Sequence, residues 1–105
     1  MILNNKTVLV TGGTGSLGKV LVRRLLSSKS GGTPKKIIVF SRDEGKQHDM
    51  RVNYLNNKYG TDEIIYKNFN NLLEFRIGDI RNYADIRSAI DEVDIVINAA
   101  ALKQV

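Results

Sequence analysis

The 105-residue sequence contains no cysteine and a single histidine, His48. The absence of cysteine excludes a disulfide framework, a thiolate nucleophile and any cysteine-based metal site. One histidine alone excludes a metal site built from several imidazoles. We therefore expect no metal centre in this chain.

Long hydrophobic runs are also absent. No segment approaches the roughly 18 consecutive apolar residues of a membrane-spanning helix. The chain does not start with a charged region followed by an apolar core of signal-peptide length, because the first apolar run stops at Gly12. These absences predict a cytoplasmic protein without a membrane span.

The charge is unevenly balanced, with 16 Lys and Arg against 11 Asp and Glu and a formal net charge of +5. A basic chain can bind nucleic acid, but here the basic residues are scattered and do not form a stripe with interleaved aromatic residues. A domain that binds a polyanionic cofactor also tolerates positive charge. We expect no nucleic-acid partner.

Apolar and polar segments alternate along the chain in the order typical of an α/β fold. Short apolar runs rich in β-branched residues predict strands, and amphipathic stretches between them predict helices. The predicted strands are 6–11, 36–40, 73–77 and 94–99, and the predicted helices are 16–28, 41–60 and 79–93.

The apolar residues of segment 61–71 follow neither the helical nor the strand periodicity clearly. We interpret the segment as an insertion that can form a helix. Repeated strand–helix units specify a parallel sheet with right-handed crossovers. The prediction is a single Rossmann-like domain over 1–105, β-α-β-α-β-α-β, with strand order 3-2-1-4 and flanking helices. The apolar strands 6–11, 36–40 and 94–99 are expected to be buried on both faces. The expected core-facing helix residues are Leu17, Val20, Leu21 and Leu25, and Tyr83, Ile86, Ala89 and Ile90.

The stretch VTGGTGSLGKVL, at the end of the first predicted strand, has two interpretations. Gly13, Gly15 and Gly18 form the Gly-x-Gly-x-x-Gly pattern of dinucleotide-binding domains, whereas Gly13, Gly18 and Lys19 form most of a P-loop. A P-loop needs Ser or Thr after the lysine to ligate Mg²⁺, and the aliphatic Val20 cannot do so. The place between an apolar strand and an amphipathic helix favours the dinucleotide interpretation. A glycine turn without a ligand is the remaining alternative.

In a dinucleotide site each glycine has a physical task. Gly12 allows the tight turn, Gly15 lets the backbone approach the pyrophosphate, and Gly18 lets the helix pack closely against the strand. The helix N-terminus then binds the phosphates through its free N–H groups and its dipole.

The end of the second predicted strand distinguishes NADP from NAD. An Asp or Glu there would bind the ribose 2′-hydroxyl of NAD, but Ser41 occupies this place. Arg42 can pair with a 2′-phosphate and stack on adenine, and Lys46 adds positive charge. Asp43 argues for NAD, because it can reach a ribose hydroxyl. NADP is favoured over NAD, although each basic side chain taken alone is more often a solvated surface residue.

Two further segments follow strands three and four. Asp79 can accept a hydrogen bond from the adenine amino group while Ile80 packs on the ring; alternatively, Asp79 is an N-cap of the next helix. Ala99, Ala100 and Ala101 leave room for a cofactor at the sheet edge, or are compact core residues.

Together, TGGTGSLG, GDI and NAAA resemble the motifs of the extended short-chain dehydrogenase/reductase superfamily. More narrowly, FSRDEGKQHDMR and AAALKQV resemble segments of the inverting UDP-N-acetylglucosamine 4,6-dehydratases of bacterial polysaccharide and flagellin-sugar biosynthesis. Gly45 departs from that family, which usually has a larger apolar residue there. The resemblance implies that Thr14, Gly15, Ser16 and Leu17 bind the NADP diphosphate, that Ser41, Arg42, Asp43 and Lys46 surround the 2′-phosphate and adenine, that Asp79 and Ile80 contact adenine, that Ala99 lines the cofactor site, and that Lys103 reaches cofactor ribose or substrate.

The resemblance also implies a homo-oligomeric, NADP-dependent nucleotide-sugar dehydratase acting on UDP-N-acetylglucosamine. The family's catalytic Thr/Ser–Asp–Lys and Tyr-x-x-x-Lys residues lie further along the chain, and none is present here. Tyr54 and Lys58 share that spacing only by chance, since they precede strand three. We therefore expect the N-terminal, cofactor-binding part of a longer enzyme, without catalytic residues. The alternatives are another extended reductase or nucleotide-sugar epimerase, or a non-catalytic cofactor-binding module.

Overall fold

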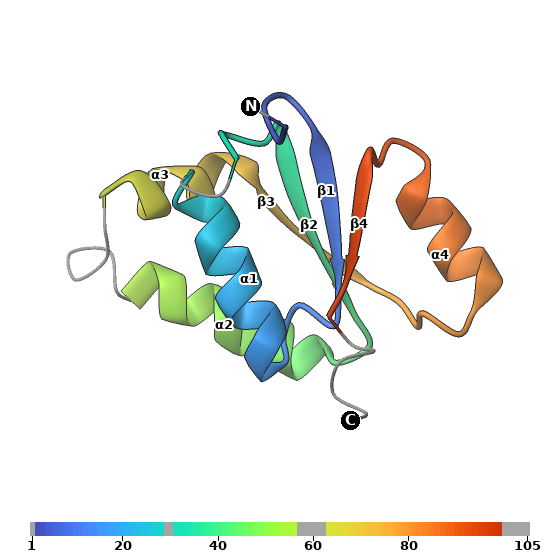
Figure 1. Ribbon diagram of the computed structural model, residues 1–105. Coiled ribbons are helices and arrows are strands. Elements are labelled where there is room, and N and C mark those ends of the chain that lie inside the picture. The colour runs from blue at the N-terminus through green and yellow to red at the C-terminus, as the bar shows by residue number, and fades with distance from the viewer. Residues whose placement is uncertain (1, 29–30, 57–62, 100–105) are drawn as a thin grey trace.

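The computed structural model describes residues 2–28, 31–56 and 63–99. Its parallel strands are hydrogen-bonded in the order β3-β2-β1-β4, which confirms the predicted α/β fold and strand order. The elements, in chain order, are β1 (Thr7–Thr11), α1 (Ser16–Leu26), β2 (Lys36–Ser41), α2 (Glu44–Asn56), α3 (Glu63–Leu72), β3 (Leu73–Ile77), α4 (Tyr83–Ile90) and β4 (Ile95–Asn98) (Figure 1).

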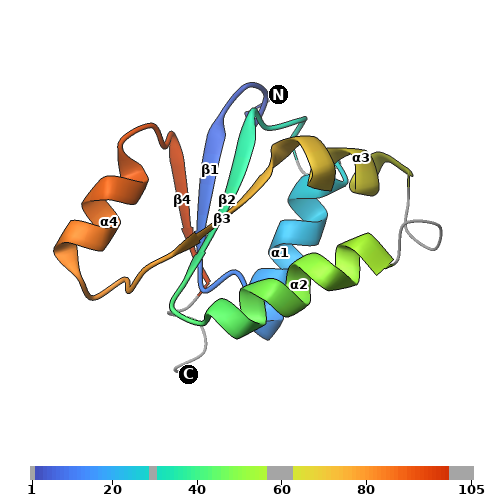
Figure 2. The same ribbon diagram turned by 180° about the vertical axis from the view of Figure 1, so that it is seen from behind.

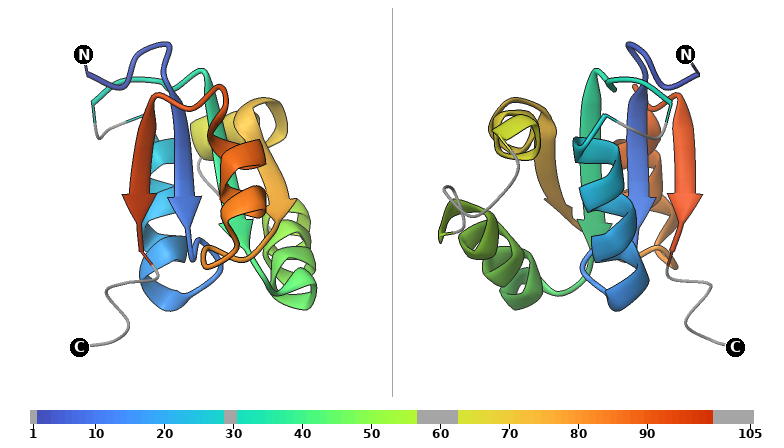
Figure 3. Two further views of the ribbon diagram at one scale, coloured as in Figure 1. Left: turned by 90° about the vertical axis from the view of Figure 1, so that its right-hand side faces the viewer. Right: turned by 60° about the vertical axis from the view of Figure 1, so that its left-hand side comes forward.

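Helices cover both faces of the sheet. Figures 1 and 2 place α1, α2 and α3 on one face and α4 on the other, and Figure 3 looks onto the two faces, with α4 in front of the strands in the left view and α1 in front of them in the right view. Alternate residues of each central strand serve the two layers, because successive side chains of a strand point to opposite faces. The first core cluster includes Val8, Val10, Ile37 and Val39 with Val22, Leu26, Met50 and Phe69, and the second contains Leu9, Ile38, Phe40 and Ala89.

The segment interpreted as an insertion contributes a helix, α3, between α2 and β3. Its buried side chains Ile65 and Phe69 lie one turn apart, and the ring of Phe69 stacks on Tyr54 of α2 with centroids 4.9 Å apart. The buried amide of Asn68 donates a 2.7 Å hydrogen bond to the carbonyl of Leu26, at the end of α1. The order of elements is therefore β-α-β-α-α-β-α-β, and α3 closes one side of the first core cluster.

The predicted apolar stripe of α1 is wrong at Val20, whose side chain is 58% exposed. The buried residues of α1 are Gly18, Val22, Leu25 and Leu26. Gly18 must face the glycine turn, so it sets the rotation of the helix, and Val20, two residues away, falls on the opposite side. The exclusion of a P-loop is unaffected, because a valine cannot ligate Mg²⁺ wherever it points.

The predicted burial is also wrong for parts of α4 and β4. Tyr83 is 76% exposed and Ile90 is also exposed, so that of the four residues expected on the core face of α4 only Ala89 is fully buried. β4 is half-buried rather than buried on both faces, because it forms one edge of the described sheet and leaves Val96 exposed. Within the described ranges, every helix is too short or too polar to cross a lipid bilayer.

Candidate functional site

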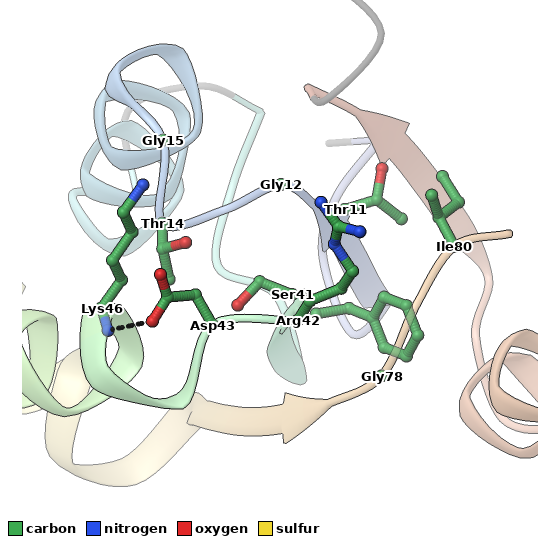
Figure 4. A pocket seen from close by; sticks show the side chains of 11 residues that line it. Thr11, Gly12, Thr14, Gly15, Ser41, Arg42, Asp43, Lys46, Gly78 and Ile80 are labelled. Carbon is green, nitrogen blue, oxygen red and sulfur yellow. Dashed lines mark hydrogen bonds between the residues drawn. The ribbon is translucent and has the colours of Figure 1, made fainter. Parts of the chain in front are cut away.

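The candidate site lies at the carboxyl edge of the sheet, where parallel strands all end. A pocket of about 320 Å³ opens there between the loop after β1, the start of α2 and the loop after β3 (Figure 4). This volume falls within the range of roughly 300–1,000 Å³ found for small-molecule sites. The lining residues are Thr11, Gly12, Thr14, Gly15, Phe40, Ser41, Arg42, Asp43, Lys46, Gly78 and Ile80.

One wall of the pocket is the glycine turn between β1 and α1. Gly12 has a φ of 69°, a left-handed conformation that favours glycine, and its N–H donates a 2.9 Å hydrogen bond to the carbonyl of Phe40. A Cβ on Gly18 would overlap the carbonyl oxygen of Gly12 and lie 2.5 Å from the Cα of Gly13. Glycine at position 18 therefore lets α1 start directly against the turn. This is the close packing that the glycine pattern predicts for Gly18.

The N-terminus of α1 follows this turn directly, since the helix begins at Ser16. Gly15 is the N-cap, and no side chain of the described residues caps the helix there. The first N–H groups of an α-helix have no partner within the helix, and the helix dipole favours an anion beside them. Of the residues predicted to bind a diphosphate, Thr14 and Gly15 line the pocket, whereas Ser16 and Leu17 belong to the first turn of α1 outside its lining.

The opposite wall is the end of β2 and the start of α2. Here the structure brings together all four residues predicted to surround a 2′-phosphate, which are Ser41, Arg42, Asp43 and Lys46. In Figure 4 the Lys46 side chain extends from α2 in the direction of the glycine turn, and Arg42 extends on the side of Ile80. The two cations give this wall a positive potential suited to an anionic group.

Asp43 has a structural task that the sequence interpretation missed. Its Oδ1 accepts a 3.0 Å hydrogen bond from the backbone N–H of Lys46, which makes Asp43 the N-cap of α2. Because of this cap the helix begins at Glu44, and the position of the Lys46 backbone at the pocket is fixed. Oδ1 of Asp43 is therefore occupied by the hydrogen bond that stabilises the start of α2.

Gln47 also escaped the sequence interpretation, although it anchors Ser41. Its buried side-chain amide donates hydrogen bonds of 2.9 Å to the Ser41 hydroxyl and 3.0 Å to the carbonyl of Arg76 in β3. Nothing in the local sequence signals this, since Gln47 lies in a polar helix where glutamine is ordinarily solvated.

Asp79, predicted to bind adenine or to cap a helix, forms a charged cluster with two arginines. Its carboxylate accepts hydrogen bonds from the backbone N–H, Nε and Nη2 of Arg81, at 2.9, 3.2 and 3.0 Å. Nη1 of Arg42 lies 3.8 Å from Oδ2 of the same carboxylate. Hydrogen bonds from Arg81, with the charges of both guanidinium groups, lower the pKa of Asp79 to about 2.

The N-cap alternative for Asp79 is wrong. Asn82 caps α4, because its side-chain oxygen accepts hydrogen bonds from the N–H groups of Ala84 and Asp85 at 3.0 and 3.2 Å. Asp79 does not line the pocket, whereas its neighbour Ile80 does.

Three lining residues were not predicted, and each follows from the strand ends. Thr11 and Phe40 stand at the carboxyl ends of β1 and β2, and Gly78 follows β3 within the GDI motif. The shared edge of parallel strands was the signal that could have found them. Ala99 is a buried member of the first core cluster outside the lining, and Ala100, Ala101 and Lys103 lie outside the described residues.

The cations and hydroxyl groups of the lining suit an anionic ligand. Within the part of the pocket that the structure describes, the carboxylate comes from Asp43, which caps α2, and the hydroxyls come from Thr11, Thr14 and Ser41. The described residues hold no group of three or more His, Asp or Glu side chains arranged to ligate a metal ion.

The sequence matches known proteins over nearly its whole length. The profile of the family described as "Polysaccharide biosynthesis protein" matches residues 8–105. A protein of Rickettsia prowazekii (strain Madrid E) named "UDP-glucose 4-epimerase" is 46% identical over 101 residues, which are 96% of this chain and 26% of that protein. The chain thus spans about a quarter of the length of the relatives it matches.

Solved structures share the fold. The "X-ray structure of Pen from Bacillus thuringiensis" has a TM-score of 0.69 and 32% identity, over 91% of this chain and 25% of that one. The reductase (R) domain of a non-ribosomal peptide synthetase from Mycobacterium tuberculosis has a TM-score of 0.58 and 27% identity, over 93% of this chain and 24% of that one.

Proposed function

The chain belongs to the polysaccharide biosynthesis protein family, and from that membership we propose that it is the NADP-binding part of a longer nucleotide-sugar-modifying enzyme. The observation that carries the proposal is the pocket at the carboxyl edge of β1 and β2. A glycine turn and a helix N-terminus face a wall that carries Ser41, Arg42 and Lys46. Backbone N–H groups on one side and two cations on the other suit a ligand with a diphosphate and a second phosphate.

The residues present fit such a dinucleotide. The close start of α1 against the glycine turn depends on Gly18, and no side chain of the described residues caps the N-terminus of this helix. The strand end that would carry a carboxylate in an NAD site carries Ser41, whose hydroxyl can donate to a phosphate oxygen. Phe40 and Ile80 add apolar surface on which an adenine ring can pack.

The residues of this chain would bind and orient. Thr14, Gly15 and the first turn of α1 would hold the diphosphate, and Arg42 and Lys46 would hold the 2′-phosphate. Ser41, fixed by Gln47, would set the distance between β2 and the ribose. When bound, a nicotinamide dinucleotide supplies reversible hydride exchange with a sugar carbon. The residues that move protons would come from the rest of the longer enzyme, and Lys103 would reach toward cofactor ribose or substrate.

Two reactions are compatible with this site, and both begin with oxidation of the sugar at C4. The segments FSRDEGKQHDMR and AAALKQV favour a 4,6-dehydratase acting on UDP-N-acetylglucosamine. The relatives named UDP-glucose 4-epimerase favour inversion at C4 instead. The dehydratase is our proposal, and the epimerase is the second candidate.

Cofactor binding is tested by isothermal titration of the 105-residue chain with NADP and with NAD. We expect NADP to bind more tightly than NAD. Heat from neither nucleotide would refute a cofactor site in this chain, and tighter binding of NAD would refute the choice of NADP.

The reaction is tested on the proposed longer enzyme with UDP-N-acetylglucosamine, with the product followed by NMR. A 4-keto-6-deoxy sugar nucleotide is expected of a dehydratase. A C4 epimer that keeps its C6 hydroxyl would establish the second candidate in its place.

A further inference from the structure

We propose that Arg81 determines the preference for a 2′-phosphate, because it engages both carboxylate oxygens of Asp79 and so limits the pairing of Asp79 with Arg42 to a long ion pair. The inference rests on the proposed NADP site and assigns a task to a residue that does not line the pocket. Arg81 is a positioning residue, since it would act through Asp79 and Arg42 and touch no part of the ligand.

The geometry of the carboxylate carries this inference. Nε and Nη2 of Arg81 address Oδ1 and Oδ2 of Asp79 as a two-pronged fork, at 3.2 and 3.0 Å, and the backbone N–H of Arg81 adds a third hydrogen bond to Oδ1. Planar, paired contacts of this kind are the strongest that a guanidinium makes with a carboxylate. The Asp79 carboxylate is therefore held firmly toward Arg81.

Arg42 competes weakly for the same carboxylate. Its Nη1 lies 3.8 Å from Oδ2 of Asp79, beyond hydrogen-bonding distance, and its side chain is 65% exposed. Arg42 lines the pocket, whereas Asp79 and Arg81 do not. The guanidinium of Arg42 thus keeps its N–H donors available on the pocket side while the neighbouring negative charge is compensated by Arg81.

Without the charge of Arg81, two effects would act against a phosphate. Asp79 would be free to pair closely with Arg42 and occupy its donors. The negative charge of Asp79 would also lack its partner and would repel a 2′-phosphate, which carries up to two negative charges. A ligand without the 2′-phosphate would be affected far less, because it does not need Arg42 as a phosphate partner.

The test compares two nucleotides that differ by one group, adenosine 2′,5′-bisphosphate and adenosine 5′-monophosphate, by isothermal titration of the 105-residue chain. The ratio of their dissociation constants measures the contribution of the 2′-phosphate to binding. Arg81→Gln is expected to weaken binding of the bisphosphate about three- to fivefold, as for loss of one partly exposed charge interaction, with little change for the monophosphate. Arg81→Lys, which keeps the charge and loses the fork, should fall between Arg81→Gln and the unsubstituted chain.

Two further variants make the result specific. Arg87→Gln is the same change at an exposed position of α4 and should leave the ratio unaltered. In the double variant Asp79→Asn with Arg81→Gln, no carboxylate remains to capture Arg42, so the ratio should return toward that of the unsubstituted chain. If Arg81 acted only by stabilising the fold, the added Asp79→Asn change would not restore the ratio of the two dissociation constants.

The outcomes separate the inference from the proposed function. If the unsubstituted chain binds neither nucleotide, the proposed cofactor site fails and the role of Arg81 fails with it. If the unsubstituted chain prefers the bisphosphate and Arg81→Gln weakens both nucleotides equally, or leaves the ratio unchanged, only the role of Arg81 is refuted.

Discussion

The buried side-chain amide of Gln47 donates a 2.9 Å hydrogen bond to the hydroxyl of Ser41, and so ties the start of α2 to the end of β2. The same amide reaches the carbonyl of Arg76 at 3.0 Å, which adds β3 to the junction. One side chain therefore links β3 to β2 and α2, the two elements that form one wall of the pocket.

Replacing Gln47 by leucine should destabilise the chain and loosen this wall. The change removes two donors from a buried junction and leaves polar acceptors there without them, which typically costs about 1–3 kcal/mol. Urea unfolding followed by circular dichroism gives the free energy of unfolding. His48→Leu, the same substitution at the exposed neighbouring residue, is the control and should shift it by less than about 0.5 kcal/mol. Equal stability of the two variants would contradict the role of Gln47.

Gly18→Ala should destabilise the chain through the glycine turn. The added Cβ would overlap the carbonyl oxygen of Gly12, so α1 or the turn must move, at a cost of about 1–3 kcal/mol or more. Gly45→Ala is the matched control, since Gly45 is an exposed first-turn residue of α2. There the Cβ would lie 3.3 Å from a single atom, Oδ1 of Asp43, and alanine is the better helix former. A Gly18→Ala chain as stable as the Gly45→Ala chain would show that the close start of α1 is not required.

Ser41→Asp should change the cofactor preference from NADP to NAD. An aspartate at the end of β2 repels a 2′-phosphate and accepts a hydrogen bond from a ribose 2′-hydroxyl, and its oxygens can still accept from the amide of Gln47. Isothermal titration should show the ratio of the NADP and NAD dissociation constants rising about tenfold or more. Ser41→Asn, which adds similar bulk without charge, should produce a much smaller change. An unaltered ratio in the aspartate variant would place the 2′-position elsewhere.

Asp79 should make the stability of the chain depend on pH in the acid range. Its pKa of about 2 lies below the value of about 3.9 for an unfolded aspartate, so the ionised carboxylate favours the folded state above pH 4, and this contribution is lost as the pH falls toward 2. Asp79→Asn should therefore be less stable than the unsubstituted chain at pH 7, with a difference that narrows between pH 4 and pH 2 in urea unfolding.

The cause of that low pKa can be checked separately. In Arg81→Gln the titration midpoint of the Asp79 carboxyl carbon, followed by NMR, should rise toward the ordinary value, because Arg81 supplies the largest contribution. A midpoint that stays near 2 in this variant would assign the shift to another group.

Val96→Lys should reduce self-association of the chain. β4 forms an edge of the described sheet, and Val96 on it is 54% exposed. Exposed apolar strand edges promote pairing between chains, and a lysine on the edge opposes it. Sedimentation velocity should show concentration-dependent association of the unsubstituted chain and less of it in Val96→Lys. Val20→Lys, the same change at an exposed valine of α1, should associate as the unsubstituted chain does.

The alternation of apolar runs and amphipathic stretches by itself determined the parallel sheet and the sheet edge at which the pocket lies. These depend on local periodicity and on the rule that parallel strands end at one edge, so they can be read without coordinates. The glycine turn was equally legible, because Gly12 and Gly18 serve backbone constraints that few other residues meet. The residues after β2 came together as predicted for the same reason, since they follow one strand directly.

Tertiary structure alone decided which polar groups meet and how each helix is rotated. Gln47 and Arg76 are 29 residues apart, and their contact depends on the register of β3 against β2. The rotation of α1 follows from the fit of Gly18 against the turn, which exposes a valine that the periodicity assigned to the core. The fork of Arg81 on Asp79 was hidden for a related reason: a sequence shows which charges are near one another along the chain, but the partner that each one takes depends on where the folded backbone directs the side chains.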